Sequence, residues 1–100
     1  MSAQPQFDEL IHAPTRLSIV ALLAASEWAE FTFVRDSLGM SDSALSKQIS
    51  TLEDAGYVTV RKTGAGRNRR THLRLSPRGR QAFRAHAAAL QQIIAASGAT

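Results

Sequence analysis

The spacing of apolar residues predicts a mainly helical chain. The segment that begins at Pro14 has a proline in its first turn and apolar residues at i, i+3, i+4 and i+7: Leu17, Val20, Ala21 and Ala24. Further apolar residues widen this stripe to most of the circumference: Ile19, Leu22 and Leu23. We therefore expect this helix at the centre of the core. A shorter helix is expected before it, over about residues 5–13, with Pro5 in its first turn.

Two helices joined by a tight turn are predicted next. The first covers Phe33 to Leu38, with Thr32 as its cap and Gly39 as its left-handed end. The second follows the N-cap Ser41 and covers about residues 42–55.

The two faces of this second helix differ in chemistry. One face carries an apolar stripe: Leu45, Ile49 and Leu52. The opposite face is short, polar and free of acids: Ser43, Ser46, Lys47 and Ser50. An ordinary solvated face usually carries paired glutamates and lysines, whereas short hydroxyl side chains permit close approach to another molecule. The pattern favours a helix-turn-helix, whose second helix enters the major groove of DNA, over the alternative of a plain surface helix.

A basic hairpin is predicted directly after these helices. Residues 57–63 are rich in β-branched side chains, and residues 71–75 alternate as a strand does. The turn between them contains two glycines and three arginines: Arg67, Arg69 and Arg70. A hairpin in this place is a wing, which contacts DNA phosphates or the minor groove. A last helix is expected from the N-cap Ser76 and Pro77 to about residue 96.

Charge is distributed unevenly along the chain. Up to Asp54 there are three basic residues and eight acids, whereas the nine basic residues beyond Asp54 have no acid among them, and the formal net charge is +4. Arginine suits bidentate contacts with phosphate or guanine. The basic half therefore favours a nucleic-acid partner, with a membrane surface or an acidic protein as the alternatives.

Composition limits the class of protein. The chain has 100 residues, of which 44% are hydrophobic, and this suffices for a single domain over residues 1–100. It contains no cysteine, which excludes disulfides and thiolate chemistry. The amino terminus lacks signal-peptide features, and the apolar run Leu17 to Ala25 is too short to span a bilayer. We expect a soluble cytoplasmic protein.

Three stretches in this order resemble one known family: HAPTRLSIVALL, LGMSDSALSKQISTLEDAGYVTVRK and GRNRRTHLRLSPRGRQAF. From Ile11 to about Ala89 the chain is similar to winged-helix regulators of the MarR and ArsR kind, most closely to compact stand-alone forms. The resemblance implies groove contacts from five residues: Ser41, Ser43, Ser46, Lys47 and Ser50. It implies phosphate or minor-groove contacts from the wing arginines: Arg67, Arg69 and Arg70. Two further residues complete the expected DNA-binding set: Lys62 and Asn68.

The chain departs from the family pattern in two places. Many relatives have an aspartate before the wing arginines, where this chain has Asn68, so an acid that would orient Arg70 is missing. The long terminal helices that form the effector pocket of full-length MarR proteins are absent or shortened. The resemblance therefore does not decide whether a small-molecule effector binds.

Apolar residues near both ends of the chain predict a homodimer. The last helix carries one set: Phe83, Ala87, Leu90, Ile93 and Ile94. The first helix carries another: Phe7, Leu10 and Ile11. Pairing across a two-fold axis would bury both sets, whereas folding of both helices onto the core is the alternative. A dimer would meet DNA half-sites about 34 Å apart.

Other chemistry has little support in the sequence. The three histidines (His12, His72 and His86) have no metal-ligand spacing and are expected on the surface or wing, where His86 could pair with its dimer mate. The glycine pair of the hairpin lacks GK[ST], and the serines lack a G-x-S-x-G elbow. Trp28 is expected as a lid over the core. We expect no enzyme, no metal and no cofactor.

The expected fold is a mainly helical α+β winged helix-turn-helix. It has a two-stranded wing over about residues 57–75, and terminal helices over about residues 5–13 and 77–96 form a dimer interface. The expected function is sequence-specific binding of double-stranded DNA by a homodimeric transcriptional regulator, most simply a repressor, without a membrane partner. The alternatives are a protein-interaction module and a non-specific nucleoid or RNA-binding protein; the wing arginines argue against the first, and the few aromatic residues argue against RNA readout.

Overall fold

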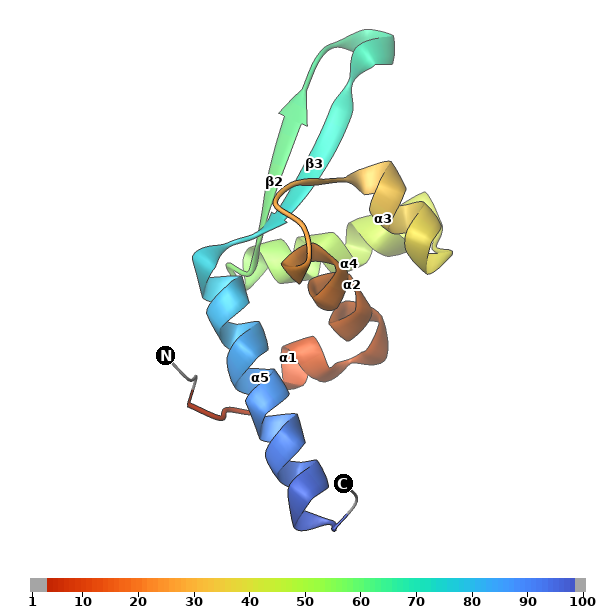
Figure 1. Ribbon diagram of the computed structural model, residues 1–100. Coiled ribbons are helices and arrows are strands. Elements are labelled where there is room, and N and C mark those ends of the chain that lie inside the picture. Colours follow the sequence, from red (N-terminus) through yellow and green to blue (C-terminus); the bar gives the residue numbers. More distant parts are fainter. Residues whose placement is uncertain (1–3, 99–100) are drawn as a thin grey trace.

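The structure is a computed structural model that describes residues 4–98. Along the chain the elements are α1 (Glu9–His12), α2 (Pro14–Ala24), β1 (Ala29–Glu30), α3 (Phe31–Leu38), α4 (Asp42–Asp54), β2 (Val58–Thr63), the 3-10 turn η1 (Gly66–Asn68), β3 (Arg70–Leu75) and α5 (Pro77–Ala96) (Figure 1). The prediction of a mainly helical α+β fold, with a helix-turn-helix followed by a wing, is confirmed. None of the helices within residues 4–98 is both long and apolar enough to cross a bilayer.

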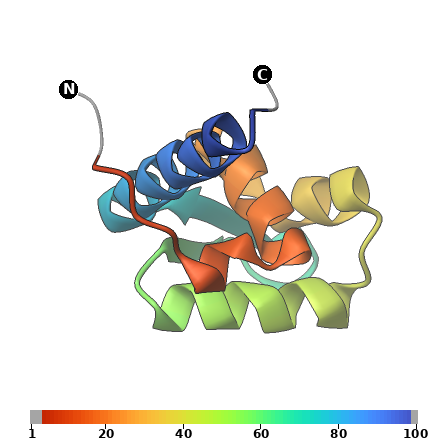
Figure 2. The same cartoon turned by 90° about the horizontal axis from the view of Figure 1, so that it is seen from below.

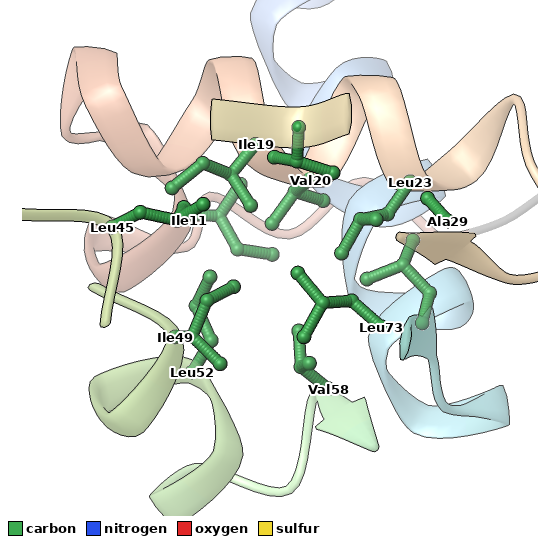
Figure 3. Close-up of a cluster of buried hydrophobic side chains, with 12 residues drawn as sticks. Ile11, Ile19, Val20, Leu23, Ala29, Leu45, Ile49, Leu52, Val58 and Leu73 are labelled. Atoms are coloured by element: carbon green, nitrogen blue, oxygen red, sulfur yellow. The ribbon is translucent and has the colours of Figure 1, made fainter. Parts of the chain in front are cut away.

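The core lies between α2, α4 and the sheet. The side chains that close it point toward one another in Figure 3, and most have no exposed area: Ile11, Ile19, Val20, Leu23, Leu45, Ile49, Leu52, Val58 and Leu73. The helix α2 contacts α1, α3, α4, α5 and β3. Its predicted place at the centre of the core is therefore confirmed, as is the buried stripe of α4. Burial of each large aliphatic side chain contributes about 1.5–3 kcal/mol to this packing.

The sheet has three antiparallel strands in the order β1-β3-β2. Strand β2 pairs with β3 along its whole length, and β1 adds a two-residue pairing in which Glu30 lies opposite His72. The expected two-stranded wing, formed by β2 and β3, is thus confirmed, whereas the third strand of the sheet, β1, was not predicted. A strand of two residues has no alternation to detect, and its pairing partner is distant in sequence.

The beginning of the chain differs from the prediction. Helix α1 starts at Glu9 rather than near Pro5, because the side chain of Asp8 caps it and accepts a hydrogen bond from the Ile11 backbone N at 3.1 Å. Residues 4–8, which we call the N-terminal arm, are not helical. The arm lies beside α5 in Figure 2, and the Gln6 backbone N donates to the Ala85 carbonyl at 2.9 Å.

The other helix ends follow the predicted caps with one exception. Ser41 accepts from the Ala44 backbone N, Ser76 accepts from the Gly79 backbone N, and Gly39 ends α3 at φ 64°. The predicted cap Thr32 is wrong, since α3 already begins at Phe31. Pairing with β3 holds the preceding residues extended, so the helix can start directly after β1.

Candidate nucleic-acid interface

The polar face of α4 is open to solvent. Helix α4 lies along one side of the molecule and α5 along the opposite side (Figure 2). The structure brings four predicted residues together on the exposed face of α4: Ser43, Ser46, Lys47 and Ser50. Ser41 is also exposed, but its Oγ already caps the helix by accepting from the Ala44 backbone N at 3.1 Å. The result is a face of short hydroxyls around one ammonium group, which has donors and acceptors for base edges.

An arginine that the sequence did not single out holds the turn before α4. Arg35 of α3 donates from Nε to Asp36 at 2.9 Å and from Nη1 to Asp42 at 2.8 Å. These bonds, first that to Asp36 and then that to Asp42, raise the pKa of Arg35 above its ordinary value. Exposed ion pairs contribute little stability. Their consequence here is that Arg35 ties α3 to the first turn of α4 and balances the charge of Asp42 there.

A second arginine joins α4 to the start of the chain. Arg16 of α2 donates from Nε to the Leu10 carbonyl at 2.6 Å and from Nη1 to Gln48 Oε1 at 3.1 Å. Since arginine can only donate, the amide oxygen of Gln48 must face Arg16. No sequence pattern relates these residues, which meet only because α2 packs against α4.

The wing carries its arginines away from the body of the protein. The hairpin of β2 and β3 extends from the helices in Figure 1, and its tip turns through two glycines with positive φ, Gly64 and Gly66. The predicted wing residues are all exposed: Lys62, Arg67, Asn68, Arg69 and Arg70. Within residues 4–98 neither Arg67 nor Arg69 forms an ion pair. Their charge is therefore available to a polyanion.

Arg70 does have an acid nearby, so the expectation that this acid is missing is wrong. Glu30 Oε1 lies 3.9 Å from Arg70 Nε and 4.0 Å from His72 Nε2. The carboxylate comes from β1 instead of the wing itself. It reaches Arg70 because Glu30 lies opposite His72 in the sheet. At this distance and exposure the pair is weak.

The expectation that Trp28 covers the core is wrong. Its ring lies against two guanidinium groups, with Arg61 Cζ at 4.2 Å and Arg74 Cζ at 5.6 Å from the ring centroid. Such contacts contribute about 0.5–1 kcal/mol at exposed sites. Arg61 and Arg74 were not among the predicted site residues, and the cation–π contact holds them against the connector that precedes β1.

The predicted dimer surface is only partly open. Ile11 has no exposed area and belongs to the core, so its place on that surface is wrong. Leu10 and Phe83 are half-buried and pack against the core. Three residues of the set remain exposed, with relative areas of 42%, 56% and 52%: Phe7, Ile93 and Ile94. Ala87 and Leu90 are half-buried between these groups.

The expectation that His86 lies on the surface is wrong. The side chain is buried, so it cannot face a dimer mate. It has no exposed area and contacts His12 and the N-terminal arm. In the described part of the chain, no group of three or more His, Cys, Asp or Glu side chains is arranged to hold a metal ion.

Comparisons with known proteins agree on the fold. A family model described as a winged helix DNA-binding domain matches residues 15–94. The uncharacterized protein MJ0432 of Methanocaldococcus jannaschii is 28% identical over 76 residues, which are 76% of this chain and 83% of that protein.

Solved structures of several regulators are also similar. A transcriptional regulator homologue from Pyrococcus horikoshii OT3 has a TM-score of 0.84 and 24% identity, over 90% of this chain and 89% of that chain. A possible transcriptional regulator for arsenical resistance has a TM-score of 0.65 and 29% identity, over 88% and 92%. The regulator PcaV of Streptomyces coelicolor, solved with its natural ligand, has a TM-score of 0.68 and 22% identity, over 90% of this chain and 65% of that chain.

Proposed function

Because the chain belongs to the family of winged helix DNA-binding domains, we propose that it is a sequence-specific transcriptional regulator that binds double-stranded DNA as a homodimer. The observation that carries this proposal is the set of exposed serines and Lys47 in the first turns of α4, beside a wing whose Arg67 and Arg69 form no ion pair among residues 4–98. Occupation of a promoter by such a protein would exclude polymerase, so repression is the simplest mode of action.

The two parts of this surface have different tasks. On α4, Lys47 donates to guanine O6 or N7, while Ser43, Ser46 and Ser50 fit against base edges in the major groove. Ser41, at the start of α4, also lies at the groove. The wing contacts the phosphate backbone or the minor groove through five residues: Lys62, Arg67, Asn68, Arg69 and Arg70. The wing therefore supplies affinity for any duplex, and the helix supplies the choice of sequence.

Exposed apolar side chains near the two ends of the chain support the homodimer. In Figure 1 the last turns of α5 extend beyond the other helices, and Ile93 and Ile94 lie there with more than half of their area exposed. Phe7 of the N-terminal arm is exposed as well. A two-fold axis through α5 would bury these side chains against their copies and present two recognition helices to half-sites about 34 Å apart.

Regulators dominate the similar structures, which supports a DNA-binding protein over an enzyme. Two alternatives predict different binding behaviour. A protein-interaction module would bind DNA weakly, and a nucleoid-type protein would bind every duplex with the same steep salt dependence.

The test is selection of binding sites from a random duplex library, followed by titration of the selected site and a scrambled duplex in a salt series. We expect a preference of about a thousandfold or more, with two chains per near-palindromic site. Ser46→Glu should remove this preference, because a carboxylate on the α4 face is repelled by DNA. Ser18→Glu, the same change at an exposed residue of α2, should retain it. If no sequence is enriched, or if Ser46→Glu keeps the preference, the proposed readout by α4 is wrong.

A further inference from the structure

A chain of hydrogen bonds holds the N-terminal arm on α5. The Asp8 backbone N donates to His86 Nδ1 at 3.0 Å, and His86 Nε2 lies 3.3 Å from His12 Nδ1. The Asp8 carboxylate accepts from the Tyr57 hydroxyl at 2.6 Å. We call these four residues the histidine network. It joins the arm, α1 and α5 to the junction between α4 and β2.

Only one arrangement of protons satisfies this network. A backbone N–H can only donate, so His86 Nδ1 must be an acceptor and His86 must be neutral with its proton on Nε2. That proton is donated to His12 Nδ1, which must then accept, and His12 keeps its own proton on Nε2. A further proton on either ring would place two donors face to face. The network is therefore complete without a positive charge and has no site for one.

The surroundings of His86 also oppose protonation. His86 has no exposed area, and the Phe7 ring lies against both imidazoles, with centroids 4.7 Å from His12 and 4.8 Å from His86. Burial lowers the pKa of His86, and the neighbouring His12 lowers it further. The Asp8 carboxylate acts in the opposite direction, but the Tyr57 hydroxyl shares its charge.

Charged groups on the other elements near α5 are engaged elsewhere. Arg16 of α2 donates to the Leu10 carbonyl and Gln48, and Arg74 of β3 lies against Trp28. On α5 itself, Arg80 donates to the Ala24 and Ser26 carbonyls, whereas Arg78 lies 5.9 Å over the ring of Tyr57, which belongs to the network. Besides burial, which is the largest cause, the groups that shift the pKa of His86 are His12, which lowers it, and Asp8, which raises it.

We propose that the histidine network is a proton-sensitive contact, in which uptake of a proton by His86 releases the N-terminal arm from α5. Release would separate Phe7 from Ile93 and Ile94, the other exposed apolar residues of the proposed pairing surface. The consequence for DNA binding rests on the proposed function, because it requires that this surface pairs two chains. A fall in pH would then weaken the dimer and its hold on DNA.

The sign of the effect follows from the direction of the shift. An unburied histidine has a pKa of about 6.5. In the docked structure burial, and then the neighbouring His12, lower the pKa of His86, so docking is favoured above about pH 6.5 and lost progressively below it. Each unit by which docking lowers the pKa corresponds to a change of about tenfold in the docking equilibrium. The pKa of Tyr57 is raised, chiefly by its hydrogen bond to Asp8. Its contribution is lost only as the pH rises above about 10, well outside the histidine range.

The first experiment uses the wild-type protein. Amide hydrogen exchange of Gln6 and Asp8 is followed from about pH 8 to about pH 5, corrected for the intrinsic pH dependence of exchange, with the amides of α2 as the internal reference. We expect the arm amides to lose their protection below about pH 6.5 while the α2 amides keep theirs. Arm amides that stay protected to about pH 5, or that lose protection together with α2, would overturn the proposal.

A pair of variants tests whether His86 is the group that responds. His86→Gln retains a carbonyl acceptor for the Asp8 backbone N but takes up no proton in this range, so its arm should stay docked in acid. His72→Gln changes a histidine outside the network and should respond as the wild type does. Arm release in His86→Gln at the wild-type pH would exclude His86 as the sensor. If His86→Gln does not fold, the wild-type exchange measurement decides alone.

Sedimentation and DNA titration over the same pH range separate this inference from the proposed function. Loss of dimer and of DNA affinity in parallel with arm release supports both. Arm release with an unchanged dimer overturns the regulatory role and leaves DNA recognition standing. A protein that is monomeric at about pH 8 contradicts the proposed homodimer, whereas the exchange measurement still tests the network.

Discussion

At the scale of single residues, Gly79 shows how closely two backbones meet at the base of the wing. It lies in the first turn of α5, and a Cβ there would overlap the Tyr57 carbonyl oxygen and lie 3.0 Å from the carbonyl carbon. The same carbonyl accepts from the Ser76 backbone N at 2.9 Å. Glycine normally weakens a helix. Here it allows the first turn of α5 to pack directly against the backbone of Tyr57, between α4 and β2.

Gly79→Ala should therefore destabilise the protein although alanine favours helices. The added methyl group forces buried backbone apart, which costs about 1–3 kcal/mol in the free energy of unfolding. Urea denaturation measures this change. Gln81→Ala, at an exposed site on the same helix, should stay within about 0.5 kcal/mol of wild type. Equal stability of the two variants would show that α5 has room to move away.

At the scale of elements, the shortest strand places an acid beside the wing. Strand β1 has two residues, yet it places Glu30 beside Arg70 and His72. A carboxylate at the edge of a basic surface lowers the attraction of that surface for DNA. The wing is thus the part of the molecule where one acid from a distant segment tunes a cluster of arginines.

Glu30→Gln should raise the affinity for every DNA sequence by a similar factor. It removes a negative charge and frees Arg70 for a phosphate, so the salt dependence should become steeper by up to about one counterion. A salt series on a specific and a scrambled duplex measures both quantities. Glu27→Gln removes another exposed acid, in the connector just before β1, and should have a smaller effect, because Glu27 forms no ion pair among residues 4–98. Identical results for the two variants would mean that only net charge matters.

At the scale of the whole molecule, some arginines are engaged within the protein and are not available to contact DNA. Arg16 and Arg80 donate to carbonyls inside the protein, and Arg35 is held by two aspartates. Arg67 and Arg69, which form no ion pair in the described part of the chain, belong to the wing tip, on the opposite end of the molecule from the last turns of α5 (Figure 1). The fold therefore separates a basic end from an apolar end, and the two ends suit two different partners.

Changing Ile93 and Ile94 together to glutamate should yield a monomer that keeps its fold. Both side chains are more than half exposed, so the fold loses little when they change, whereas a paired interface would acquire buried charge. Sedimentation equilibrium and the stoichiometry on DNA report the change, and circular dichroism reports the fold. Gln92→Glu adds charge to the same turn on another face of α5 and should remain dimeric. A dimer in the isoleucine variant would place the interface elsewhere.

Much of the fold, and the central part of the candidate site, could be predicted from the sequence because their signals are local. The periods of α2, α4 and α5 lie within a few turns, and their caps Ser41 and Ser76 lie next to the helices that they start. The polar face of α4 follows from the same period. The wing arginines were recognisable because a turn between two strands must lie at a tip.

The contacts that hold the residues of that site in place were decided only by the tertiary structure. Glu30 reaches Arg70, Arg16 reaches Gln48, and His86 meets Asp8 through residues that are distant in the chain and have no common pattern. Burial of His86 and the extended N-terminal arm depend on where α5 lies, which is a property of the packed core. Short-range order in the sequence determined the helices and the wing, whereas contacts between distant segments determined which charges remain free to bind.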